Sequence, residues 1–427
     1  MSTETKKKFM GIDIPTDLTK FNFLTLFFCT TLGGVVTNSI NGIQPSYLKD
    51  YLKVSEKTFG TVNGSVLTVG EIAAVIFLFV FGALSDKKGR KFVISVGLAG
   101  AAISYIFFCN SHILGNLFGI DGIYLAYAGR FIIVASVAGV WATFITITAD
   151  YTDEANRAKG MSLNGIFTGF GMLLAMGVFA TLPRFIGVPY TFYLVSFTAI
   201  LTLLYVRIGL VDRKVSKEQH MGQLKNVINF LKTSPQMLMC YAARFFVMAA
   251  ITTVGTFIFI WAVNASRQLG VASETAQMRI GIYIFIAGMF SFPAFPVFAI
   301  LCDKIGRFKT LAISFLIAGG ALISFGLIEN PLSLKILPCM VVFFISQAGM
   351  LLTSQTLASE LSPKPLMGTM LGGLSTCGQL GAGLFFSVSG VSMDKLGAQA
   401  PYMIIGVFCL LMIVWVLAVE GKALKKN

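Results

Sequence analysis

The sequence predicts an all-α membrane protein with twelve transmembrane helices in two pseudo-symmetric six-helix bundles. Three observations predict this fold class: the composition, the number of long apolar runs, and a motif that occurs at the same place in each half. Of the 427 residues, 56% are hydrophobic and only 12% are charged, and the mean hydropathy is +0.80. Since a soluble domain carries roughly 25% charged residues, the composition excludes a soluble enzyme, a disordered chain and a nucleic-acid-binding protein.

Twelve apolar runs provide the predicted helices. Crossing the hydrocarbon core of a bilayer takes about 20 apolar residues in a helix, and each run is close to that length or longer. Most faces of these runs are apolar, as expected for helices that contact both lipid and one another. The runs cover residues 21–43, 59–84, 92–110, 122–149, 161–182, 189–210, 237–262, 279–301, 310–328, 335–358, 366–390 and 401–419.

The polar segments divide these runs into two sets of six. The expected order is a cytoplasmic tail, an N-terminal bundle, a linker, a C-terminal bundle and a second tail. The linker stretch 222–231 either forms a short helix on the membrane surface or is a solvated tether. The corresponding ranges are 1–20, 21–210, 211–236, 237–419 and 420–427.

Lysines and arginines are concentrated in the two termini, the linker and every second connection. By the positive-inside rule these segments face the cytoplasm, so we expect both termini inside, at a bacterial cytoplasmic (inner) membrane. The net charge of +14 is therefore a topology signal, and we expect contact with the lipid bilayer but with no nucleic acid. We also expect a monomer.

The sequence offers no catalytic or metal-binding pattern. The seven cysteines are scattered singly, without a C-x-x-C pair and without a repeated pairing with the two histidines, so we expect no metal and no cofactor. The motifs H-E-x-x-H, G-x-S-x-G and G-x-x-x-x-G-K-[ST] do not occur. We therefore expect neither an enzyme nor an ATP-driven pump.

One motif occurs at equivalent places in the two halves. D-K-x-G-R follows the second run at residues 86–90 and the eighth run at residues 303–307. A single copy would be weak evidence, but two copies in a six-plus-six topology are typical of the internal repeats from which many secondary transporters are built.

With these motifs the whole chain resembles the major facilitator superfamily. The resemblance implies a small-molecule substrate that binds between the bundles and crosses by alternating access. It also implies a cytoplasmic gate of charged and glycine residues, in which an aspartate holds an arginine or a helix N-terminus. The alternative for the basic residues of the motif is that they only anchor the topology. The gate residues are Asp86, Gly89, Arg90, Asp150 and Arg157 in the first half and Asp303, Gly306, Arg307 and Glu360 in the second.

Three charged residues stand out because they lie well inside the predicted spans and away from the span ends. Such a group costs at least about 2.5–3.5 kcal/mol near the midplane, so it usually faces a cavity or a partner. Glu71 lies about 22 Å along its helix from Asp86, which is at the cytoplasmic end. Glu71 is therefore near the midplane, which makes it the candidate for proton coupling. Arg130 pairs with Glu71 either in one state only or as a fixed structural pair. Arg244 faces either the substrate or the inner mouth of the protein.

Further cavity candidates follow from the resemblance, because spans one, four, seven and ten line the cavity in this superfamily. Asn38, Trp141 and Gln347 lie on such spans and join Arg130 and Arg244 as substrate-cavity candidates. Each amide is equally well explained as an interhelical hydrogen bond.

The predicted function is secondary active transport of a small organic solute, with an anionic solute favoured and a proton or sodium ion as the coupling ion. A passive facilitator and an exporter of drugs or metabolites are the alternatives, and a non-transporting membrane sensor is a remote one. Drug/proton antiporters tend to carry Gly-Pro in span five, whereas Met172 follows Gly171 here. This departure disfavours a typical multidrug antiporter.

Overall fold

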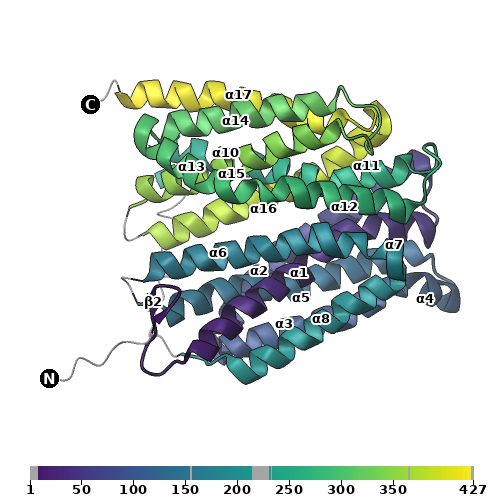
Figure 1. Ribbon diagram of the computed structural model, residues 1–427, viewed down its shortest axis with the longest axis horizontal. Helices are drawn as coiled ribbons and strands as arrows, with labels where there is room; N and C mark the ends of the chain where they lie inside the picture. Colours follow the sequence, from purple (N-terminus) through teal and green to yellow (C-terminus); the bar gives the residue numbers. More distant parts are fainter. Residues whose placement is uncertain (1–7, 154–155, 214–229, 232, 364–365, 425–427) are drawn as a thin grey trace. The chain divides into compact units, whose positions relative to one another are not determined.

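The computed structural model describes residues 8–153, 156–213, 230–231, 233–363 and 366–424 (Figure 1). Within these residues, eleven helices are long and apolar enough to cross a membrane. The predicted run 366–390 lies in a further helix, α16 (Met367–Leu396), which has 30 residues but is rich in glycine and serine. The helical membrane fold predicted from the sequence is thereby confirmed.

The helices of the first half follow the predicted runs, although several extend beyond them. The fifth span continues through a π-helical turn and a 3₁₀ turn, which we label η2 and η3. These helices are α1 (Lys20–Asp50), α2 (Phe59–Lys88), α3 (Arg90–Cys109), α4 (Ser111–Phe118), α5 (Gly122–Tyr151), α6 (Arg157–Leu173), η2 (Leu174–Val178), η3 (Phe179–Thr181), α7 (Pro183–Ile186) and α8 (Val188–Gly209), with a short 3₁₀ helix η1 (Glu56–Thr58) before α2.

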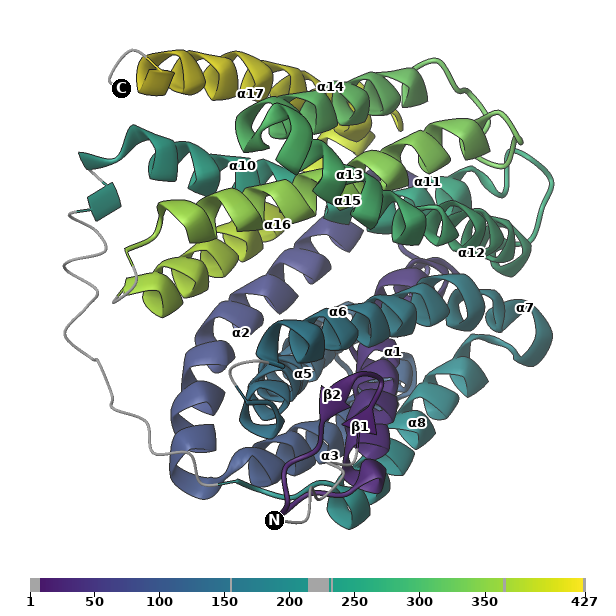
Figure 2. The ribbon, with the colours of Figure 1, turned by 60° about the vertical axis from the view of Figure 1, so that its left-hand side comes forward.

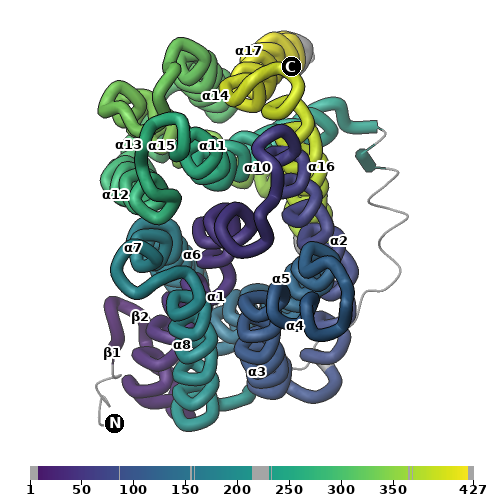
Figure 3. The backbone as a smooth tube through the Cα atoms, turned by 90° about the vertical axis from the view of Figure 1, so that its right-hand side faces the viewer, coloured from purple at the N-terminus to yellow at the C-terminus, as the bar shows by residue number. Residues whose placement is uncertain are grey.

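The second half repeats this plan, and Figure 2 shows its helices from another side. Its first span also contains a π-helical turn, η4, between two α-helical segments. The helices are α10 (Pro235–Thr252), η4 (Thr253–Phe257), α11 (Ile258–Ala265), α12 (Ser273–Met289), α13 (Ser291–Ile305), α14 (Arg307–Phe325), α15 (Ile336–Leu361), α16 and α17 (Ala400–Leu424). Packing partners include α3 with α8, and α14 with α17 (Figure 3).

Residues 8–13, before α1, form a short β-hairpin. Strands β1 (Lys8–Phe9) and β2 (Ile12–Asp13) pair antiparallel around a turn with positive φ at Met10 and Gly11. Phe9 stacks on Phe27 of α1 at 6.0 Å between ring centroids, and Ile12 is fully buried. Part of the segment expected from sequence as a tail therefore packs against the bundle, because its apolar side chains find an aromatic surface there.

The chain divides into two compact units. The first contains Met1–Lys53 and Ile72–Lys217, and the second contains Val54–Glu71 and Glu218–Asn427. Helix α2 thus begins in the second unit and ends in the first, with the division directly after Glu71. The sequence-based division instead assigns all of 21–210 to one bundle, and most of the predicted linker, including 222–229, lies outside the described residues.

Close helix approach in the first unit depends on small residues. Gly34 of α1 faces Gly171 of α6, and a Cβ built on Gly34 would lie 3.1 Å from the Gly171 Cα. A Cβ on Gly171 would overlap the carbonyl oxygen of Thr31. Without a hydrophobic driving force between helices in lipid, such backbone contact is a main source of attraction.

Candidate functional site

The first charged cluster joins the ends of α2, α3 and α5. Nε of Arg90 lies 3.3 Å from Oδ2 of Asp150, and both side chains are largely buried, at 11% and 8% exposed. Nη1 of Arg90 donates to the Ser85 hydroxyl at 2.8 Å. Because Gly89 has a φ of +97°, α2 ends there and the chain turns directly into α3, which places Arg90 against α5.

A second cluster repeats this geometry in the other unit. Nε of Arg307 donates to Oε1 of Glu360 at 2.9 Å, and Nη2 lies 3.5 Å from Asp303. Gly306, with a φ of +90°, ends α13 and begins the turn into α14. Arg307 is 33% exposed and Glu360 is 45% exposed. Water therefore screens the Arg307–Glu360 pair more strongly than the Arg90–Asp150 pair. We expect the Arg307–Glu360 pair to contribute less to the stability of the fold.

Two of the predicted gate residues are not seen in either charged cluster. Arg157 is exposed at the start of α6 and forms no ion pair within the described part of the chain. The side chain of Asp86 lies outside what the structure describes. Arg213 contacts Asp150 in place of Arg157. Nη1 of Arg213 donates to the backbone carbonyl oxygen of Asp150 at 2.6 Å, and Nε of Arg213 forms an ion pair with Asp17 at 2.8 Å.

Glu71 lies near the middle of α2, a helix of 30 residues. It is half-buried, and a Cβ built on Gly383 of α16 would be 3.1 Å from the Glu71 Cβ. The absence of a side chain at Gly383 therefore leaves the room that the Glu71 side chain needs. Glu71 is also the last residue of α2 that belongs to the second unit.

Arg130 is buried in α5, with 3% exposure. Its Nη2 donates to Oδ1 of Asn41 in α1 at 2.7 Å. Asn38, one turn earlier, donates instead to the carbonyl of Gly34 in its own helix at 2.9 Å. The amide that contacts the arginine is therefore Asn41 and not the predicted cavity residue Asn38.

Arg244 lies in α10, whose span runs over 31 residues from Pro235 to Ala265. Its Nε and Nη1 atoms are buried and have no hydrogen-bond partner among the described residues. The aliphatic part of the side chain packs on Gly378 of α16, where a Cβ would lie 3.3 Å from the Arg244 Cγ. The hydroxyl of Tyr241, one turn earlier in α10, is not the hydrogen-bond partner of Arg244, because it donates to the Met370 carbonyl at 2.6 Å.

Two other cavity candidates have less distinctive surroundings. Trp141 of α5 is 44% exposed, and Gln347 of α15 is half-buried. By contrast, Trp261 of α11 is buried and packs on Tyr402, with 5.8 Å between ring centroids.

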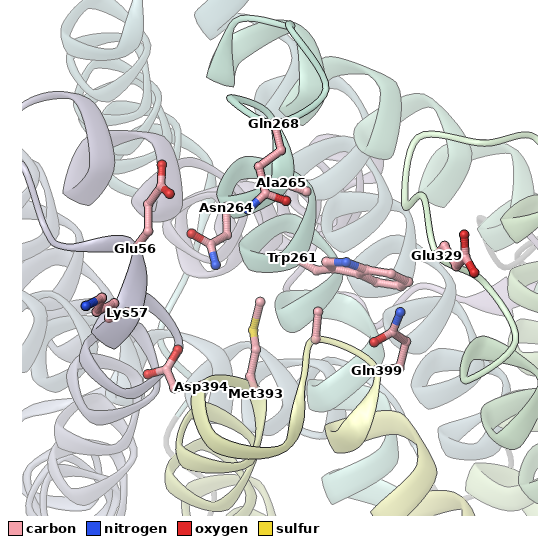
Figure 4. Close-up of a pocket in the computed structure, with 11 residues that line it drawn as sticks. Glu56, Lys57, Trp261, Asn264, Ala265, Gln268, Glu329, Met393, Asp394 and Gln399 are labelled. Atoms are coloured by element: carbon pink, nitrogen blue, oxygen red, sulfur yellow. The ribbon is translucent and has the colours of Figure 1, made fainter.

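The second unit contains a polar pocket of about 300 Å³ (Figure 4). Trp261, Asn264 and Gln268 line one side, and Glu56, Lys57 and Asp394 line another. No group of three or more histidine, cysteine or carboxylate residues in the described ranges is arranged to hold a metal ion.

Asp394, in the last turn of α16, is a residue that sequence analysis missed. Its Oδ1 accepts from the backbone N–H of Gly60 at 2.8 Å, and its Oδ2 accepts from Thr61 at 2.6 Å. A signal for it was present, because residues 394–397 read D-K-x-G like the two motifs already identified. The missing arginine after Gly397 hides this third copy from a search for D-K-x-G-R.

Apolar spans, repeated arginine–acid pairs and an ionisable residue at mid-helix define the class of polytopic membrane transporters. The sequence profile of the Major Facilitator Superfamily matches residues 26–386, and the chain belongs to this family. The family consists of transporters and not of enzymes.

Among curated relatives, magnetosome protein MamH of Paramagnetospirillum magneticum is 26% identical over 90% of this chain and 88% of its own. Magnetosome protein MamZ of Magnetospirillum gryphiswaldense is 25% identical over 92% of this chain, which spans only 61% of MamZ. A class H tetracycline resistance protein of Pasteurella multocida is 28% identical over 36% of this chain and 35% of its own.

Solved structures support the fold. A mutant form of the nucleoside transporter NupG superposes with a TM-score of 0.75 at 16% identity, over 93% of this chain and 99% of NupG. A D-xylose–proton symporter superposes with a TM-score of 0.72 at 16% identity, over 92% and 97% of the two chains. At these identities the likeness concerns the fold alone.

Proposed function

We propose that this protein carries a small organic solute across a membrane by alternating access and couples that movement to a proton at Glu71. The observation that carries the proposal is the position of Glu71. It is the one carboxylate near the middle of α2, and it is half-buried beside Gly383 of α16. We infer that a carboxyl group in this position changes its surroundings when α2 and α16 separate during the transport cycle.

Changing surroundings make a carboxyl group a suitable coupling group. Removal from water favours its neutral form, whereas a neighbouring cation or hydrogen-bond donor favours its charged form. If the Glu71 carboxyl group is exposed to water in one state and removed from water in another, it would bind and release a proton during each cycle. We propose Arg130, buried in α5, as the cation that Glu71 meets in one of these states.

The arginines favour an anionic solute. Arginine stays charged at physiological pH, and its planar guanidinium matches a carboxylate or phosphate. Two nitrogens of Arg244 lack a hydrogen-bond partner in the described part of the chain, and Arg130 offers a second positive centre. We place the protein in a bacterial inner membrane as a monomer with cytoplasmic termini. We favour a proton over sodium as the coupling ion because a carboxyl group can bind and release a proton.

Export is the second candidate function. The match to a tetracycline resistance protein over about a third of the chain favours it. The sequence Gly171-Met172 disfavours it, because the Gly-Pro of typical drug antiporters is missing. If Glu71 is a fixed structural group, the protein would instead act as a passive facilitator.

The substitution Glu71→Gln tests the coupling. A thermal-shift screen of the purified protein over organic acids, sugars and nucleosides first identifies a ligand, since a ligand that binds the folded state raises its apparent stability. In proteoliposomes, wild type should accumulate that ligand when a pH gradient is imposed. Glu71→Gln should lose accumulation while keeping exchange of labelled for unlabelled ligand.

Glu274→Gln, in the first turn of α12, is the matched control and should retain gradient-driven accumulation. Equal accumulation by wild type and Glu71→Gln would contradict proton coupling at Glu71. If none of the solutes crosses under any gradient, a non-transporting role such as a sensor gains support.

A further inference from the structure

The N-terminus of α2 is capped by a side chain from another helix. The first N–H groups of a helix have no partner within it. In α2, the N–H groups of Gly60 and Thr61 are bound by the two carboxylate oxygens of Asp394 in α16, at 2.8 and 2.6 Å. A negative charge is favourable at this end, because the helix dipole places partial positive charge there.

A seam of small residues continues from this cap along α2 and α16. A Cβ on Gly60 would lie 2.7 Å from the Gly390 carbonyl oxygen, and a Cβ on Gly64 would overlap the Phe386 carbonyl oxygen. Further along, the Thr68 hydroxyl lies 2.8 Å from the Ser387 hydroxyl and donates to the Gly383 carbonyl at 3.0 Å. The seam therefore runs from Asp394 to the level of Glu71.

The turn after Asp394 has the geometry of the two gate motifs. Gly397 has a φ of +108°, compared with +97° at Gly89 and +90° at Gly306. In all three turns, D-K-x-G ends a helix and the glycine takes a conformation that other residues rarely adopt. This third copy lies at the end of α16 that leads into α17, which is the predicted external side.

We propose that Asp394, with Gly60 and Thr61, forms an external latch that holds the first half of α2 against α16 in one state of the transport cycle. The proposal rests on the proposed function: if the solute enters between the two bundles predicted from sequence, opening of the external side separates α2 of the first bundle from α16 of the second. Two carboxylate–amide hydrogen bonds at the end of a seam of small residues are suited to this role. These hydrogen bonds use backbone N–H groups, so they need no large side chain between the two helices. Water can replace the carboxylate as their acceptor when the helices separate.

Hydrogen exchange of the purified, detergent-solubilised protein tests the latch directly, because its donors are two identified amides. Asp394→Asn cannot accept at both oxygens, so exchange at Gly60 and Thr61 should quicken by roughly two- to thirty-fold, the range expected for loss of a helix N-cap. Lys395→Gln changes the adjacent exposed residue and is the control. In this variant the amides of Gly60 and Thr61 should exchange at the wild-type rate. Unchanged exchange in Asp394→Asn would overturn the proposal.

A second measurement separates a latch from a simple helix cap. Thr68→Cys places a thiol in the seam, and its reaction with a maleimide reports separation of α2 from α16, after subtraction of the background of native cysteines. Adding Asp394→Asn should quicken this reaction. Gly64→Ala, whose methyl group forces the helices apart, should do so as well.

If Gly64→Ala quickens the Thr68→Cys reaction and Asp394→Asn does not, the seam alone holds the helices and the latch is refuted. Neither measurement needs a transported solute. A failure of the latch is therefore distinguishable from a failure of the proposed transport, which the proteoliposome assay of Glu71→Gln addresses.

Discussion

At the scale of single residues, similar arginines have different roles because their surroundings differ. Arg90 is buried beside Asp150 and Ser85, so its charge is neutralised within the protein. Arg244 has two buried nitrogens without a partner in the described residues. Because an arginine in a membrane span is costly unless it is paired or solvated, Arg244 is the residue at which we expect an anion to bind.

Arg244→Gln tests this expectation. We expect succinate or inorganic phosphate to raise the unfolding temperature of wild type and to leave that of Arg244→Gln unchanged, because the amide carries no charge. A ligand at a hundred times its Kd stabilises the folded state by about 2.7 kcal/mol, which a thermal-shift assay resolves.

Arg207→Gln, at the exposed end of α8, is the control for a general loss of positive charge and should respond as wild type does. Equal anion-induced shifts in wild type and Arg244→Gln would show that Arg244 does not bind these anions.

At the scale of helices, close approach depends on glycine positions that a hydropathy pattern does not distinguish. Gly165 and Gly171 both lie on α6, yet a Cβ on Gly165 would meet nothing within 4 Å, whereas one on Gly171 would overlap the backbone of α1. The span-five proline of drug antiporters is absent here, and the span instead contains the π-helical turn η2 shortly after Gly171 and Met172.

Gly171→Ala should destabilise the protein by about 1–3 kcal/mol, as is usual when a methyl group is forced into a packed interface. Gly165→Ala, the matched control in the same helix, should be neutral or slightly stabilising, because alanine favours helix by up to about 1 kcal/mol over glycine. Unfolding of both variants in detergent with increasing denaturant gives the comparison. A cost at Gly165 equal to that at Gly171 would contradict the role assigned to the contact between α1 and α6.

At the scale of the whole molecule, the charge distribution predicts the orientation in the membrane. Lys309, in the first turn of α14, should face the cytoplasm, and Asn330, between α14 and α15, should face outward. Both residues are exposed, which makes them suitable sites for labelling.

An impermeant thiol reagent applied to intact cells should therefore label Asn330→Cys but not Lys309→Cys, and both should react after permeabilisation. The reverse pattern would place both termini outside and would invert every assignment of an internal or external side. The parent protein, which keeps its native cysteines, provides the background in each case.

The membrane class, the helical spans and the two D-K-x-G-R turns could all be predicted from the amino-acid sequence. They depend on local properties, namely apolar length, charge placement and the glycine that a turn with positive φ requires. The identity of the acid beside each arginine was also foreseeable, since Asp150 and Glu360 end the spans on the same side.

Which distant groups meet became known only from the folded protein. Helix packing brings Asn41 to Arg130, joins Arg213 instead of Arg157 to Asp150, and places Asp394 on the N-terminus of α2. Such pairings depend on the rotation and depth of each helix against its neighbours. In spans whose faces are nearly all apolar, the sequence pattern fixes neither, whereas close backbone contacts at glycines such as Gly34 and Gly171 constrain both.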